Sequence, residues 1–183
     1  MLPGDCATPQ ELELVALVNE YRVQNVLMPV TPARWLSTTA QWHLWDRVNN
    51  PGAVGGMCST HSWSANPPTG VFWTPVCWTA GQSTAMWIKP NEISAGAYTG
   101  NGFELTADCG CTMTATQALL QWQGSPAHNP VILQQGVWSG IQFTGVGVAI
   151  VDGFAVLWFG DGGPNGGALP ACEQDQIFSA GFE

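Results

Sequence analysis

The stretch that decides the fold runs from residue 116 to residue 133 and reads TQALLQWQGSPAHNPVIL. Its first half has apolar residues at helical spacing, and the Gly-Ser-Pro at 124–126 then supplies the residues that usually end a helix. His128 therefore follows the end of a helix, and the apolar run 131–133 returns the chain to a buried environment. We expect this segment to hold the imidazole of His128 in a fixed position.

The composition limits the classes of partner. The chain has 183 residues, which suits one domain, and 45% of them are apolar, enough to fill a sizeable core. Four basic residues stand against 13 acidic ones and the net charge is −9, so we expect no nucleic-acid partner. This charge also argues against binding to an anionic membrane surface, but it leaves apolar ligands open. Since no apolar run is long enough to cross a bilayer, we expect no transmembrane segment.

Six cysteines in a chain poor in lysine indicate an oxidising compartment. We therefore expect three disulfides and a secreted, extracellular or periplasmic protein. The first residues, MLPGDC, contain neither the basic nor the apolar region of a signal peptide. We interpret the sequence as a mature chain in which an initiator Met replaces a removed export signal.

The pairing of the cysteines is open, because six cysteines can pair in many ways. We expect Cys58 and Cys77 to bond, which would close the loop that contains His61. Cys109 and Cys111 are separated by one glycine, so a bond between them looks sterically awkward, and we expect them to pair outward with Cys6 and Cys172. A metal site at Cys-Gly-Cys is the weaker alternative, because no second Cys/His pair stands at ligand spacing.

Periodicity predicts three helices and a hairpin. Residues 8–24 begin with a capping box and a proline, 36–48 have apolar residues at helical spacing, and 114–123 is the helix before His128. The apolar runs 145–150 and 154–160 flank an Asp-Gly pair, which is a strong hairpin signal. These elements predict an α+β protein, a three-layer α-β-α sandwich with a mostly antiparallel central sheet.

The pattern W-x-x-S-P-x-H-x-x-x-I-L, from Trp122 to Leu133, resembles the signature of the CAP superfamily, also called SCP domains. The L-x-N-x-x-R at 17–22 resembles the first helix of that family, L-x-x-x-A-x-x-H at 36–43 the second, and GVGVA and WFG the last two strands. The short Ser-Pro-x-His connection is similar to that of bacterial members. The resemblance implies one CAP domain over residues 1–161, with an insertion at about 66–98 that we expect to be irregular and a Gly/Pro-rich extension at 162–183.

The resemblance also implies a cavity formed by His61, Glu104 and His128. The His-Ser at 61–62 resembles the position of the first cavity histidine, and residues 101–107 resemble the strand whose glutamate faces the cavity. Glu104 is preferred because its distance from Trp122 in the sequence is close to the family's, and Glu92 is the second choice. The ordinary alternatives are an exposed loop histidine and a solvated carboxylate.

Two family features are not expected in the site. His43, between Trp42 and Trp45 on a helix, is left out because such a histidine is more often packed or at the surface than a ligand. The second glutamate that many eukaryotic members have after the tryptophan is absent, because Gln123, Gly124 and Ser125 follow Trp122. The four-residue form of the family site is therefore not expected.

Two neutral imidazoles can bind a divalent metal, with a glutamate acting directly or through water, and this ligand type favours Zn²⁺ at His61 and His128. Acid–base hydrolysis would also need a nucleophile and an oxyanion hole, and no G-x-S-x-G occurs. Ten tryptophans and few charges suit indole-lined grooves, although core packing is the ordinary alternative. We expect a secreted protein that binds a lipid or sterol, or an extracellular protein or glycan. The alternative is a metal-assisted hydrolase, protease-like or esterase-like.

Overall fold

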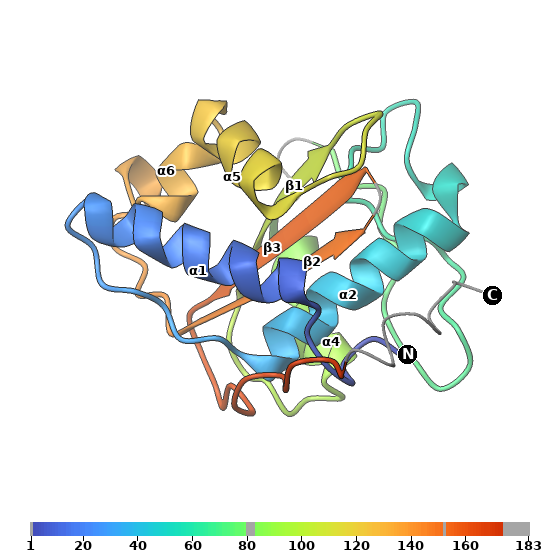
Figure 1. The fold of residues 1–183 in the computed structure, drawn as a ribbon. Helices are drawn as coiled ribbons and strands as arrows, with labels where there is room; N and C mark the ends of the chain where they lie inside the picture. Colours follow the sequence, from blue (N-terminus) through green and yellow to red (C-terminus); the bar gives the residue numbers. More distant parts are fainter. Residues whose placement is uncertain (1, 80–82, 152, 174–183) are drawn as a thin grey trace.

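A three-stranded antiparallel sheet lies at the centre of the computed structural model, which describes residues 2–79, 83–151 and 153–173 (Figure 1). Its strands are β1 (Gly102–Asp108), β2 (Gly145–Val151) and β3 (Phe154–Gly160), in the order β1-β3-β2. The predicted hairpin is confirmed, since β2 and β3 pair directly. Gly153 in its turn has a φ of 78°, which glycine adopts without strain, and Asp152 lies outside the described residues.

Two helices cover one face of the sheet, α1 (Pro9–Gln24) and α5 (Ala115–Gly124). Both begin with a capping box, Thr8 with Glu11 and Thr114 with Gln117, so the predicted start of the first helix is confirmed. The shared core contains Leu14, Val18, Leu119 and Trp122 from the helices and Phe103, Leu105, Val148, Leu157 and Phe159 from the strands.

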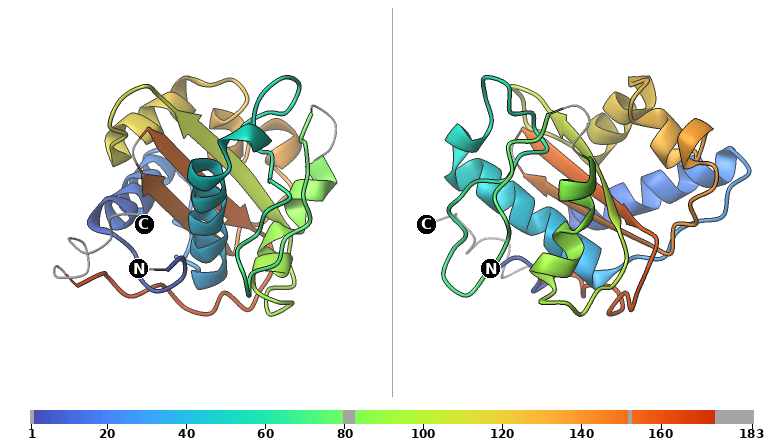
Figure 2. Two further views of the ribbon diagram at one scale, coloured as in Figure 1. Left: turned by 90° about the vertical axis from the view of Figure 1, so that its right-hand side faces the viewer. Right: turned by 180° about the vertical axis from the view of Figure 1, so that it is seen from behind.

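The opposite face of the sheet packs against α2 (Arg34–Asn49) (Figure 2). Leu36, Ala40 and Leu44 fall on one side of this helix and meet Val156 and Trp158. The two backbones approach closely at Gly147, where a Cβ atom would lie 2.0 Å from the backbone nitrogen of Ser37. Helices therefore cover both faces of a mostly antiparallel sheet, as expected of an α+β protein.

The segment 66–98 is less irregular than the sequence predicts, because it contains two short helices, α3 (Ser83–Trp87) and α4 (Lys89–Ile93). Pro90 occupies the first turn of α4, where its missing N–H has no helical partner to lose. Lys89 is buried, and its Nζ donates to the Thr74 carbonyl and, at 2.7 Å, to Glu92 Oε2. The bond from Lys89 to Thr74 thus joins two parts of the insertion that lie 15 residues apart, which no local pattern reveals.

The remaining short elements are α6 (Asn129–Ile132), η1 (Pro51–Ala53) and η2 (Gly136–Trp138). Of the predicted extension at 162–183, residues 174–183 lie outside the described residues. The part up to residue 173 runs beside the start of the chain, since Gly167 O accepts from Arg34 N at 2.6 Å and Ala7 bridges Ala171. The division into a domain and an extension remains a prediction. No helix in the described part of the chain has the length and apolar character needed to cross a membrane.

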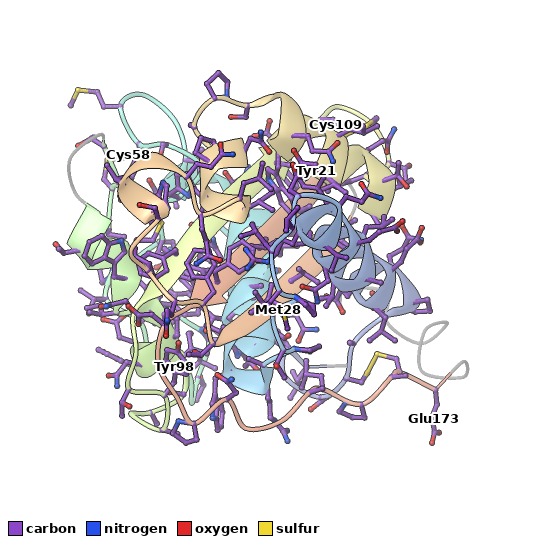
Figure 3. The ribbon with its side chains drawn as sticks, turned by 90° about the vertical axis from the view of Figure 1, so that its left-hand side faces the viewer. Tyr21, Met28, Cys58, Tyr98, Cys109 and Glu173 are labelled. Carbon is purple, nitrogen blue, oxygen red and sulfur yellow. A yellow bond between two sulfur atoms is a disulfide. The ribbon has the colours of Figure 1, made fainter. Side chains whose placement is uncertain are left out.

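Three disulfides are present, and Figure 3 shows Cys58 and Cys109 near opposite sides of its upper edge. The predicted Cys58–Cys77 bond is confirmed. The predicted outward pairing of Cys109 and Cys111 is wrong, because these two bond to each other and Cys6 bonds to Cys172. The turn after β1 brings the Cα atoms of Cys109 and Cys111 to 5.2 Å, within the usual range of about 4.4–6.8 Å for a disulfide.

Candidate functional site

A buried carboxylate, that of Glu104, is the centre of the site. Glu104 alternates along β1 with Phe103 and Leu105, so its side chain lies on the other face of the strand, toward α2. The side chain is 0% exposed. A carboxylate in such a place needs partners for its charge and for both oxygen atoms.

Two histidines supply these partners. His43 Nδ1, from α2, is hydrogen bonded to Glu104 Oε1, and His61 Nδ1 lies 2.9 Å from Glu104 Oε2. His61 belongs to the loop closed by Cys58 and Cys77. Both carboxylate oxygens are therefore occupied by imidazole nitrogens from separate parts of the chain.

The second ring nitrogen of His43 fixes the proton count of the pair. His43 Nε2 lies 3.0 Å from the Ser62 carbonyl oxygen, which can only accept, so Nε2 carries a proton. The ring also stacks on Trp63, with 4.4 Å between centroids and an interplanar angle of 9°. One further proton lies between His43 Nδ1 and Glu104, and the pair is neutral overall wherever that proton resides.

The pKa of Glu104 indicates where the proton lies. Burial alone would raise the pKa of this carboxyl, but the charge of His43 and the hydrogen bonds from His43 and His61 outweigh burial and lower it below its ordinary value. The carboxylate form is thus favoured, and His43 is the buried cation that balances it.

An ionised Glu104 also determines the tautomer of His61. A carboxylate only accepts hydrogen bonds, so His61 Nδ1 is the donor and Nε2 is the ring nitrogen that can keep a lone pair. The Trp78 ring contacts His61 edge-on, with 4.9 Å between centroids. The His61 ring is therefore held from two sides, and Nε2 is the nitrogen that remains for a ligand.

His128 brings a second imidazole to the same place. It stands at the N-cap position of α6, and its backbone N–H donates to the Ser125 carbonyl at 3.1 Å. Its ring centroid lies 6.4 Å from that of His61. Burial lowers the pKa of His128, repulsion from His61 in its protonated form lowers it further, and Glu104 opposes both without reversing them. At neutral pH His128 is uncharged and keeps a lone pair.

Both rings line an open pocket of about 330 Å³. Its lining residues are Thr60, His61, Thr106, Ala107, Asp108, Gln121, Ser125 and His128. A separate pocket of about 420 Å³, beside Asn101 and Asp161, contains none of the three histidines. We call the smaller pocket the histidine pocket, because His61 and His128 line it, and the pKa of His128 is shifted from its ordinary value.

The structure brings His61, Glu104 and His128 together. It places Glu92, the second choice, elsewhere, on α4 beside Lys89. His43, which was not expected in the site, contacts Glu104 directly. The spacing Leu36, Ala40, His43 could have identified it, because these positions share the helix face that packs on the sheet.

The tryptophans do not form a groove at the histidine pocket. Those at 42, 63, 73, 122 and 158 are buried, and none of the ten is among the residues that line either pocket described above. The ordinary alternative, core packing, therefore accounts for most of them.

The donor set limits what metal the pocket could hold. Among the residues that the structure describes, no group of three or more His, Cys, Asp or Glu side chains is arranged to hold a metal ion. Both Glu104 oxygens already accept hydrogen bonds, so of the three predicted cavity residues only His61 and His128 keep an atom available to a metal. They fit a two-ligand site completed by water and do not fit a three-ligand catalytic centre.

No protein-family model and no curated protein matches the sequence. Among solved structures, the chain is similar to a cysteine-rich secretory protein from Staphylococcus aureus, with a TM-score of 0.54 and 12% identity over 83% of this chain. This chain spans only 38% of the staphylococcal one. An outer surface protein from Borrelia burgdorferi gives a TM-score of 0.56 and 11% identity, over 85% of this chain and 95% of that one. Together with the sequence motifs, these similarities show that the chain has a CAP/SCP-like fold.

Proposed function

We propose that this chain is a secreted CAP-like protein that binds a ligand in the histidine pocket through His61 and His128. The observation that carries the proposal is the hydrogen bond from His61 Nδ1 to the buried Glu104 carboxylate. A ring held in this way presents one nitrogen at a fixed place, which is how carboxylate–histidine pairs orient catalytic and ligand-binding imidazoles.

The lining of the pocket favours a polar group as its occupant. Hydroxyl groups, a carboxylate, an amide and two imidazoles line it, and its volume of about 330 Å³ is small for a ligand site. A lipid or sterol would place its polar end here, with its apolar part outside the pocket. An extracellular protein or glycan partner would likewise insert one polar group.

Zn²⁺ is the simplest ligand of this kind. The two imidazoles would supply neutral nitrogen donors, and we expect weak binding because water would complete the coordination. Bound Zn²⁺ would supply Lewis acidity at the pocket. On that basis a metal-assisted hydrolase is the alternative function, in which Glu104 would orient His61 as a ligand of the metal.

Two structural features support the rest of the proposal. Helices on both faces of the sheet support a three-layer α-β-α sandwich for the domain. Three disulfides support passage through an oxidising compartment, and with it export of the protein.

Titration calorimetry with Zn²⁺ tests the assignment of the pocket. The parent protein should bind Zn²⁺ at pH 7.5 and more weakly at pH 5.5, because protons compete for the imidazoles. The His61→Ala/His128→Ala variant should retain its circular dichroism spectrum and bind no Zn²⁺. Binding by that variant equal to the parent's would place the metal elsewhere. Mass spectrometry of an organic extract of the purified protein then tests for a bound lipid or sterol, and an ester or casein substrate tests for turnover.

A further inference from the structure

The Cys109–Cys111 disulfide lies outside the histidine site, in the turn that joins β1 to α5. Cys111 and Gly110 are exposed and Cys109 is half-buried. The Cys109 N–H donates to the Gly153 carbonyl at 2.8 Å, which attaches this turn to the β2–β3 hairpin through the backbone. Met113, just beyond the turn, is buried in the core. The turn is therefore held at both ends without the sulfur–sulfur bond.

The lengths of the loops that the three disulfides close indicate that the stability of the fold depends least on Cys109–Cys111. The bonds join residues separated by 166, 19 and 2 positions, for Cys6–Cys172, Cys58–Cys77 and Cys109–Cys111 respectively. In the chain-entropy account the stabilisation by a cross-link increases with the length of the loop it closes. The bond between Cys109 and Cys111 restrains the unfolded chain least, so it can open while the other two maintain the fold.

We propose that Cys109–Cys111 is a thiol–disulfide exchange site that oxidises dithiols of extracellular proteins or peptides. A substrate thiolate attacks Sγ of Cys111, which is the more exposed of the two residues. The sulfur–sulfur bond breaks, Cys109 leaves as a thiolate, and a mixed disulfide joins the substrate to Cys111.

The second substrate thiolate completes the exchange. It attacks the substrate sulfur of the mixed disulfide, so the substrate acquires a disulfide and Cys111 leaves as a thiolate. Two electrons pass from the substrate to the cysteine pair, and the two protons lost by the substrate thiols are taken up by Cys109 and Cys111. A small-molecule disulfide then oxidises the two cysteines and restores the bond between them by the same steps in reverse. Cys109 and Cys111 stay close during these steps because they are only two positions apart in the sequence.

A cationic dithiol peptide is the appropriate probe, because the chain has a net charge of −9 and Asp108, next to Cys109, is 53% exposed. The protein is mixed with the reduced peptide at pH 7.5, quenched with acid, alkylated and mapped by mass spectrometry. We expect one peptide disulfide per protein and alkylation at Cys109 and Cys111, with Cys6, Cys58, Cys77 and Cys172 unlabelled. Labelling of Cys58 and Cys77 before Cys109 and Cys111 would overturn the proposal.

A pair of variants gives a matched control. Cys109→Ser/Cys111→Ser should oxidise the peptide at least about tenfold more slowly and keep the parent's melting temperature. Cys58→Ser/Cys77→Ser, which removes the bond of the longer loop, should melt earlier and keep the exchange rate. If the first variant oxidises the peptide at the parental rate, the exchange site is not this pair. If Cys109→Ser/Cys111→Ser melts at a lower temperature than Cys58→Ser/Cys77→Ser, the Cys109–Cys111 bond is structural and the proposal is wrong. The labelling pattern of the parent protein decides the matter even if a variant does not fold.

Discussion

Oε2 of Glu104 lies 2.9 Å from Nδ1 of His61, although the first residue comes from a sheet strand and the second from a disulfide-closed loop. This hydrogen bond links the core of the fold to the pocket. The other oxygen of the same carboxylate bonds to His43, whose positive charge compensates for its burial. The orientation of the His61 ring toward a ligand therefore depends on the pair of Glu104 and His43, whose side chains are shielded from solvent.

Glu104→Gln removes the carboxylate charge while keeping the shape of the side chain. His43 would then be a buried cation without its counterion, and we expect the free energy of unfolding to fall by about 3–5 kcal/mol. Urea unfolding followed by tryptophan fluorescence measures this loss. Glu13→Gln, at an exposed position of α1, is the matched control and should change stability by less than about 0.5 kcal/mol. An equal loss of unfolding free energy in Glu104→Gln and Glu13→Gln would show that the pair of Glu104 with His43 does not stabilise the fold.

The pH dependence of stability should reveal the same carboxylate. Since the pKa of folded Glu104 lies below its ordinary value of 4.5, the group stabilises the fold at pH values above 4.5. That contribution should be lost as the pH falls from 4.5 through the lower pKa of the folded state. We expect the parent protein to lose more stability over this interval than Glu104→Gln does. Parallel melting curves for the two proteins below pH 4.5 would contradict the lowered pKa.

The contact of α2 with β2 predicts that Gly147 tolerates no side chain. A Cβ atom at this position would lie 2.0 Å from Ser37 N and 2.2 Å from Leu36 C, and backbone atoms cannot move aside as a side chain can. We expect Gly147→Ala to lower the free energy of unfolding by about 3 kcal/mol, measured by urea unfolding. Gly140→Ala, where a Cβ would meet nothing within 4 Å, should leave the stability close to the parent's.

The sequence predicted the elements that depend on local patterns. The capping box at Thr8 and Glu11, and the two apolar runs joined by Asp-Gly, are short-range signals, and both elements occur where they were expected. The helices at 83–93 were missed because their anchor, the bond from Lys89 to the Thr74 carbonyl, is tertiary. Proline-rich sequence alone does not reveal a buried lysine that fixes the segment.

The two other differences also have tertiary causes. Cys109 and Cys111 bond to each other in a turn whose backbone is hydrogen bonded to Gly153, a residue far away in the sequence. His43 was left out because the tryptophans beside it suggested simple packing, and the ring does stack on Trp63. One residue can both pack on an aromatic ring and pair with a charged side chain. The pairing of His43 with a carboxylate is revealed only by the position of Glu104 on the strand that faces α2.

The ¹⁵N chemical shifts of the three histidine rings test the central claim most directly, since they report which nitrogen of each ring carries a proton. The structure predicts a proton on Nε2 of His43, which faces the Ser62 carbonyl, and a proton on Nδ1 of His61, which faces Glu104. It also predicts a neutral His128 at pH 7. A His61 ring protonated on Nε2 in the parent protein would contradict the account, because the nitrogen assigned to the ligand would then have no lone pair.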